Sequence, residues 1–149
     1  MKHDLLTFSE AEFAVIAESF GEVVSTERYT CYACAIMPDH VHILIRKHKH
    51  TAEEMIHALI SASREKLIAS GRREPHHPTW TWGHGWKVFL DHPDDIRRTI
   101  TYVDRNPIKI GLPRQSWPFV MPYDNWPLHA GHSPNSPYAK RLREVGRYN

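Results

Sequence analysis

Residues 28–46 have the sequence RYTCYACAIMPDHVHILIR, which contains two runs of strand-forming residues with a turn between them. The first run, 28–36, is rich in aromatic, small apolar and β-branched residues, and in the second, 40–46, apolar residues recur at every other position. Met37-Pro38-Asp39 separates them, and a Pro-Asp pair is ordinary turn chemistry. The segment therefore predicts an antiparallel β-hairpin.

The residues that precede the hairpin predict a strand and a helix. Residues 4–8 form a short apolar run that fits a first strand. Ser9 then has the character of an N-cap, and Glu12 stands at the capping-box position three residues later. We expect this helix to continue through Phe20 and to end at Gly21.

A second helix and a further strand are expected after the hairpin. Thr51 is a cap residue with Glu54 three positions on, and apolar residues recur at helical spacing from there until Gly71. Residues 72–85 are rich in proline, glycine, histidine and tryptophan and predict a loop. Residues 86–91 predict another strand.

The last predicted helix starts at a pair of acidic residues. Asp94 and Asp95 favour a helix N-terminus because their charges meet the positive end of the helix dipole. Pro107 lacks an N–H group and disfavours helical geometry in the residue before it. This helix is therefore expected to end near Asn106.

The order of these elements predicts an α+β protein with the ferredoxin-like βαββαβ pattern, an antiparallel sheet and an added C-terminal helix. We expect one domain over residues 1–112 and a proline-rich C-terminal extension over residues 113–149, partly anchored by Trp117 and Trp126. A ferredoxin-like fold hosts many activities, so the function has to be inferred from a site.

Composition limits the class of protein. A chain of 149 residues with 41% hydrophobic and 24% charged residues suits one globular domain, and no segment is apolar enough for a membrane span. The N-terminus does not resemble a secretory signal, so we expect a cytoplasmic protein without membrane partners. A net charge of +2 does not by itself predict nucleic-acid binding, although basic residues cluster locally, as at Arg97-Arg98.

The two cysteines are expected to be structural. Cys31 and Cys34 lie three apart in a predicted strand, where regular alternation places them on opposite faces. The alternative is a zinc site shared with nearby histidines, which needs both sulfur atoms on one side.

The second strand of the hairpin carries the strongest chemical signal. His40 and His42 are two apart and so lie on one face of the strand, while Val41 and Ile43 turn to the other. Two adjacent imidazoles suit a divalent cation. The alternative is a pair of partly exposed surface histidines.

Tyr102 and Asn106 are four apart in the last predicted helix and therefore share one of its surfaces. The apolar stripe of that helix consists of Ile96, Ile100 and Val103, and Tyr102 lies well to the side of it. Tyr102 is thus expected outside the core, where its hydroxyl is either a surface group or a reactive one.

Two segments, 37–45 (MPDHVHILI) and 102–107 (YVDRNP), together with Gly111-Leu112, resemble the IS200/IS605-like tyrosine transposases. Within that family they look most like the REP-associated branch, in which the tyrosine is followed by an Asn-Pro pair. The resemblance extends over about residues 4–112 and rests on both motifs in the right order and spacing.

The resemblance implies a nuclease with a His-hydrophobic-His motif that cleaves single-stranded DNA near hairpins. It assigns His40 and His42 as ligands of Mg²⁺ or Mn²⁺, Tyr102 as the catalytic nucleophile and Asn106 as the third ligand of the metal. The expected product is a 5′-phosphotyrosine link, which lets a second DNA end rejoin. Related transposases can exchange the tyrosine helix within a homodimer.

Two other functions stay open at this stage. A domesticated relative would bind hairpin DNA without strand transfer, and a zinc hydrolase would use His40 and His42 but not Tyr102. Tryptophans in the 72–91 region are candidates for stacking on unpaired bases, although packing explains them equally well. They are Trp80, Trp82 and Trp86.

Overall fold

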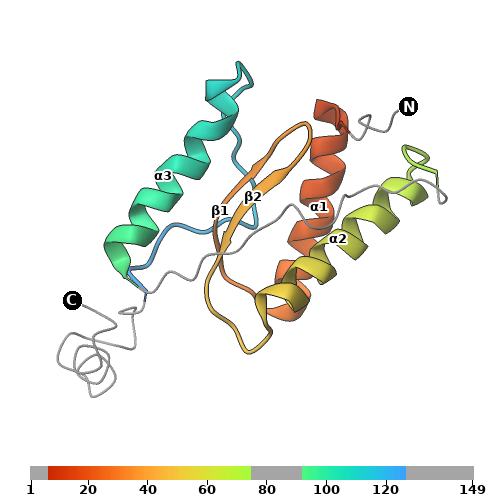
Figure 1. The fold of residues 1–149 in the computed structure, drawn as a ribbon. Helices are drawn as coiled ribbons and strands as arrows, with labels where there is room; N and C mark the ends of the chain where they lie inside the picture. Colours follow the sequence, from red (N-terminus) through yellow and green to blue (C-terminus); the bar gives the residue numbers. More distant parts are fainter. Residues whose placement is uncertain (1–6, 75–91, 127–149) are drawn as a thin grey trace.

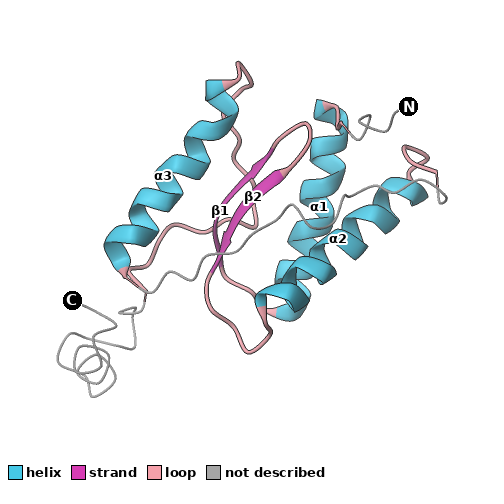
Figure 2. Ribbon diagram, viewed as in Figure 1, coloured by secondary structure: helices cyan, strands magenta, loops and turns pink. Residues whose placement is uncertain are grey.

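A computed structural model describes residues 7–74 and 92–126. Its elements in chain order are α1 (Glu10–Glu27), β1 (Cys31–Ile36), β2 (Val41–Ile45), α2 (Ala52–Ala69) and α3 (Pro93–Lys109). The described residues contain one two-stranded antiparallel sheet and three helices, so the α+β class is confirmed (Figure 2). The predicted strand at 86–91 lies outside the described residues, as do residues 4–6, and a four-stranded ferredoxin-like sheet stays a prediction.

The hairpin lies between two helical layers, with α1 and α2 on one side and α3 on the other (Figure 1). Ile16 of α1 and Leu67 of α2 are fully buried in the cluster that covers one face of the hairpin. On the opposite face, Val103 of α3 packs on Ala33 and Ala35. These two alanines are small, which lets the backbone of α3 approach the sheet closely.

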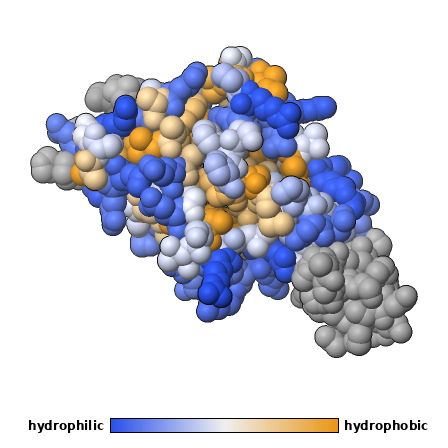
Figure 3. Space-filling model, turned by 180° about the vertical axis from the view of Figure 1, so that it is seen from behind, coloured by the Kyte–Doolittle hydropathy of each residue, from blue (hydrophilic) through white to orange (hydrophobic). Residues whose placement is uncertain are grey.

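Seen from behind, the molecule is apolar in its middle and hydrophilic around it (Figure 3). Within residues 7–74 and 92–126, none of the helices combines the length and apolar character that a membrane span requires.

A β-bulge changes the expected placement of the cysteines. The register of β1 against β2 shifts between Cys31 and Ala33, so Tyr32 and Ala33 both face the α3 layer. The prediction that Cys31 and Cys34 face opposite sides is therefore wrong. The extra residue of the bulge shifts the alternation by one, so that Cys31 faces the same side as Cys34. Both are buried free thiols in the α1–α2 cluster.

The bulge brings both sulfurs to one side, as the zinc alternative requires, but within residues 7–74 and 92–126 no group of three or more His, Cys, Asp or Glu side chains could hold a metal. The cysteines face α1 and α2, whereas His42 lies on the α3 side of the hairpin. Burial raises the pKa of the Cys31 thiol to about 12 and also raises the pKa of Cys34 above its usual value. Both sulfurs are therefore protonated thiols at neutral pH.

The described end of the first predicted strand is not a strand. The backbone N–H of Phe8 donates to the carbonyl of Pro38 at 2.7 Å, in the turn between β1 and β2. The Phe8 ring is buried in the α1–α2 cluster. This residue is thus held by the turn and the core and not by a β-ladder.

The capping box at the start of α1 is confirmed, but the predicted end is wrong. Ser9 and Glu12 bond reciprocally, and the helix continues through Gly21 to Glu27. A Cβ built on Gly21 would lie 3.6 Å from the ring of Phe119, which is an ordinary van der Waals contact, so Gly21 packs against Phe119 inside the helix instead of ending it. Arg28 ends it, with a left-handed φ of 61°.

The other two helices begin near their predicted starts. The capping box of Thr51 and Glu54 is confirmed, and Gly71, with a φ of +78°, follows the end of α2. By contrast, α3 passes through Pro107 to Lys109, so its predicted end near Asn106 is wrong. Pro107 lies in the last turn, where one absent hydrogen bond is tolerated and its ring is fully buried.

The chain after α3 runs along the outer edge of β1. The side chain of Gln115 bonds both backbone groups of Ile36, accepting from its N–H at 2.8 Å and donating to its carbonyl at 2.7 Å. Farther along, Met121 N–H donates to the carbonyl of Cys31 at 2.9 Å. Trp117 packs on the α1–α2 cluster and Trp126 is buried against the α3 layer, so both anchors are confirmed.

Gln115→Ala is expected to lower the free energy of unfolding by about 1–3 kcal/mol, because it leaves the N–H and carbonyl of Ile36 without their partner. Urea denaturation followed by circular dichroism measures this loss. Ser116→Ala is the control, since Ser116 is exposed next to it. Equal stabilities of the two variants would show that the glutamine does not hold the edge of β1.

Candidate active site

His40 and His42 lie together on the α3 side of the hairpin. His42 is in β2 opposite Ala35, and His40 directly precedes the strand. Their Nε2 atoms are 3.1 Å apart and their ring centroids 4.7 Å. Val41 and Ile43 pack on the α1–α2 cluster, so the predicted alternation of this strand is confirmed.

Asp39 orients His40. The Nδ1 atom of His40 lies 2.6 Å from Oδ1 of Asp39. Because a carboxylate accepts hydrogen bonds, Nδ1 donates to it, and Nε2 is the nitrogen left to act as a metal ligand. This role of Asp39 was not predicted from the sequence, where Asp39 was assigned only to the turn. The signal was its position directly before His40.

Burial lowers the pKa of His42 below its usual value, and the neighbouring His40 lowers it further. His42 is therefore a neutral imidazole at neutral pH. That is the protonation state in which a histidine binds a metal.

Tyr102 reaches this pair from α3. Its side chain is 51% exposed, and its ring makes an edge contact with His42 at a centroid distance of 5.8 Å. Ile96 and Val103 of the same helix are buried, so Tyr102 lies outside the apolar stripe, as predicted. The fold thus brings the two motifs together within one chain.

Lys109 is a neighbour of Tyr102 that the sequence analysis did not single out. Its Nζ atom lies 4.8 Å from the centroid of the Tyr102 ring. Residues seven apart lie on nearly the same side of a helix, which is the signal that would have found it. The site therefore has a cation next to its phenol.

Asn106 shares the surface of Tyr102 but bonds within its own helix. Its amide Nδ2 donates to the carbonyl of Tyr102 at 3.1 Å. The structure therefore brings His42 into contact with both His40 and Tyr102 and holds Asn106 one helical turn from the tyrosine.

The histidine pair fits a divalent cation. Two neighbouring ligands of an octahedral ion at about 2.1 Å are separated by about 3.0 Å, and the Nε2 atoms are 3.1 Å apart. Over the described residues, no group of three His, Cys, Asp or Glu side chains is arranged to hold a metal. A complete coordination sphere would need other oxygen atoms, such as those of Asn106, water or a phosphate.

Tryptophans 80, 82 and 86 lie outside the described residues, so their predicted stacking role stays a prediction.

Comparison with known proteins gives one family. The profile described as "Transposase IS200 like" matches residues 7–106, which include α1, the hairpin, α2 and α3 as far as Asn106. No curated protein and no solved structure matches the chain. The match covers more than half of the sequence and includes His40, His42, Tyr102 and Asn106, and the chain therefore belongs to the IS200-like transposase family.

Proposed function

We propose that this transposase is a metal-dependent endonuclease for single-stranded DNA that cleaves and rejoins its substrate near hairpins through a 5′-phosphotyrosine intermediate. The observation that carries the proposal is the contact of Tyr102 with His42, which is itself paired with His40. A nucleophile and a candidate pair of metal ligands thus share one surface. The Asn106-Pro107 pair supports assignment to the REP-associated branch.

His40 and His42 would hold Mg²⁺ or Mn²⁺, with Asn106 as the third protein ligand. The bound ion would supply Lewis-acid polarisation of a non-bridging oxygen of the scissile phosphate. Asp39 fixes the ring of His40, as carboxylate partners of metal-binding histidines commonly do.

Tyr102 is the nucleophile of this proposal. Its deprotonated oxygen attacks phosphorus, a tyrosine–phosphate bond forms, and the bond from phosphorus to the 3′ oxygen breaks. The 3′ oxygen takes up a proton and leaves as a hydroxyl. Attack by the 3′-hydroxyl of a second DNA end reverses these steps, rejoins the DNA and releases Tyr102.

One chain carries both motifs in contact, so the proposed reaction does not need exchange of α3 within a homodimer. A DNA substrate also implies a cytoplasmic place of action. A DNA-binding relative without strand transfer is the second candidate. It would have the same arrangement of His40, His42 and Tyr102 but would not cleave or rejoin DNA.

The wild-type protein tests the proposal directly. It is incubated with a labelled hairpin-bearing single strand and Mn²⁺ or Mg²⁺, and a denaturing gel is searched for a DNA–protein band. We expect a covalent band that appears with metal and is absent when EDTA is added. Hairpin binding without any covalent band would support the DNA-binding relative instead.

A further inference from the structure

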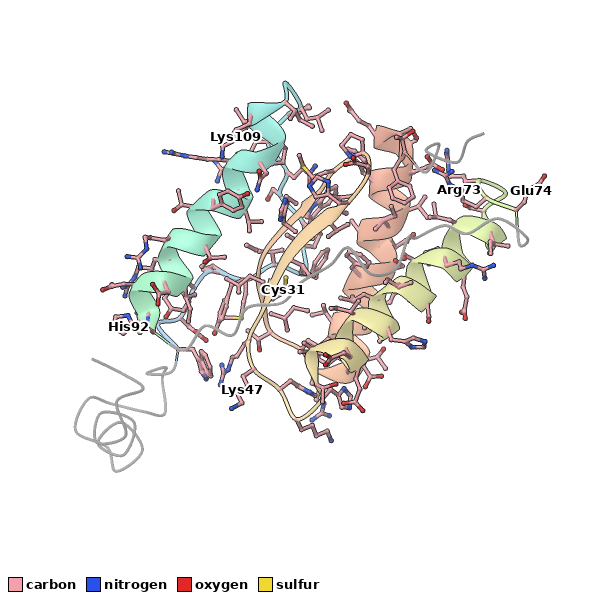
Figure 4. All side chains as sticks on the ribbon, in the orientation of Figure 1. Cys31, Lys47, Arg73, Glu74, His92 and Lys109 are labelled. Atoms are coloured by element: carbon pink, nitrogen blue, oxygen red, sulfur yellow. The ribbon has the colours of Figure 1, made fainter. Side chains whose placement is uncertain are left out.

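The solvent-facing side of α3 forms a basic surface around Tyr102. A shallow depression there is lined by residues 97, 98, 101, 102, 105 and 109, which are arginines, a lysine, a threonine and the tyrosine. All six side chains are exposed. At about 100° per residue they occupy roughly 140° of the helix surface. Lys109 marks one end of this helix and His92 the other in Figure 4.

Two of the cations already have partners. Arg97 bonds Asp94 at 3.0 Å and Asn125 at 2.9 Å, and Arg98 bonds Asp95. These contacts neutralise the first turns of α3. They leave the other end of the helix as the source of positive charge.

Arg105 and Lys109 are the other two cations of this depression. Within the described residues neither forms an ion pair with a carboxylate. Arg105 lies one turn after Tyr102, and Lys109 lies over its ring. Asp104, the carboxylate of this end of α3, lines a different depression, so Arg105 and Lys109 are the unneutralised charges on the side of the phenol.

We propose that Arg105 and Lys109 bind two successive phosphates on one side of the scissile one, so that a single DNA strand runs along the exposed face of α3. The proposal rests on the proposed function, since it defines the substrate path at the same site. A planar guanidinium and a point-like ammonium both bind phosphate, and Arg adds a second hydrogen bond.

The geometry favours an unpaired strand. The ring of Tyr102 is 51% exposed, with His42 at its edge and Lys109 over its face. A phosphate that reaches the hydroxyl must therefore lie close to the surface of α3. A single strand has the flexibility to follow such a surface, and its phosphates carry the charge that the two cations match.

Salt-dependent binding tests this path. Affinity for a fluorescein-labelled oligothymidylate is measured by anisotropy over a range of KCl concentrations, with EDTA present so that no cleavage occurs. For single strands the slope of log K against log salt changes by about 0.7 for each phosphate contact. We expect Arg105→Gln and Lys109→Gln each to make this negative slope shallower by about 0.7. The double variant should make it shallower by about 1.4.

Arg72→Gln is the matched control, because Arg72 is an exposed arginine just after α2. An unchanged slope in the double variant, or an equal reduction in Arg72→Gln, would overturn the proposal. Circular dichroism confirms that each variant is folded. The readout is independent of chemistry: a reduced slope without any covalent band in the wild type would leave this path supported and the proposed cleavage refuted.

Discussion

Tyr102→Phe is expected to abolish the covalent DNA–protein band and to reduce strand cleavage by at least roughly a thousandfold. The substitution removes one oxygen atom, which is the atom that would attack phosphorus. Tyr102 is 51% exposed, so the variant should fold as the wild type does. The measurement is a denaturing gel of labelled hairpin DNA in Mn²⁺, with folding checked by circular dichroism.

Tyr29→Phe is the control for this result. Its hydroxyl bonds Nδ1 of His50 at 2.9 Å, at the end of the hairpin away from His40. This variant should cleave normally. Normal cleavage by Tyr102→Phe would instead identify a metal hydrolase that activates water, which is the alternative that uses the two histidines alone.

His40→Ala together with His42→Ala is expected to reduce cleavage about a hundred- to a thousandfold, because it removes the candidate protein nitrogen ligands and with them the Lewis-acid contribution. The double variant should also lose Mn²⁺ binding, as measured by electron paramagnetic resonance of the free ion. Hairpin DNA should still bind in EDTA, since neither histidine is needed for contact with phosphates at Arg105 and Lys109.

The second histidine pair of the chain is the matched control. His48 and His50 also lie two apart, with ring centroids at 4.7 Å, but they pack around Tyr29 at the other end of the hairpin. Their double alanine variant should retain cleavage and Mn²⁺ binding. If it lost Mn²⁺ and the His40–His42 variant did not, the proposed metal ligands would be the wrong pair.

Asn106→Ala should reduce cleavage about tenfold, which is less than the loss expected for the histidine variant. The same denaturing gel measures this reduction.

The hairpin and the starts of the helices follow from local sequence. The alternation of His40 to Ile45 and the turn chemistry of Pro38 depend on neighbouring residues only, and so do the capping boxes at Ser9 and Thr51. The histidine pair was identified at this level, because residue type and spacing are sufficient to place two imidazoles on one face of a strand, whereas the roles of Tyr102 and Asn106 came from the family resemblance.

The ends of helices α1 and α3 depend on contacts that no local pattern contains. Gly21 stays helical because the helix beyond it buries Val24 in the α1–α2 cluster, and Gly21 itself packs against Phe119, almost a hundred residues later. Pro107 stays helical because its ring fills the core, which offsets one lost hydrogen bond. Tertiary packing outweighs intrinsic preference at both positions, since each preference amounts to only about 1–3 kcal/mol.

The bulge in β1 and the set of residues that meet at the site also could not be predicted from local sequence. A single extra residue at Tyr32 reverses the alternation, and with it the side on which Cys31 lies. The contacts of Tyr102 with His42 and Lys109 arise only when α3 packs on the alanines of β1. Local sequence thus determines which reactive side chains are present on each strand and helix. The packing of α3 on the hairpin determines which of them come into contact, because the core shared by distant segments sets the distances between their side chains.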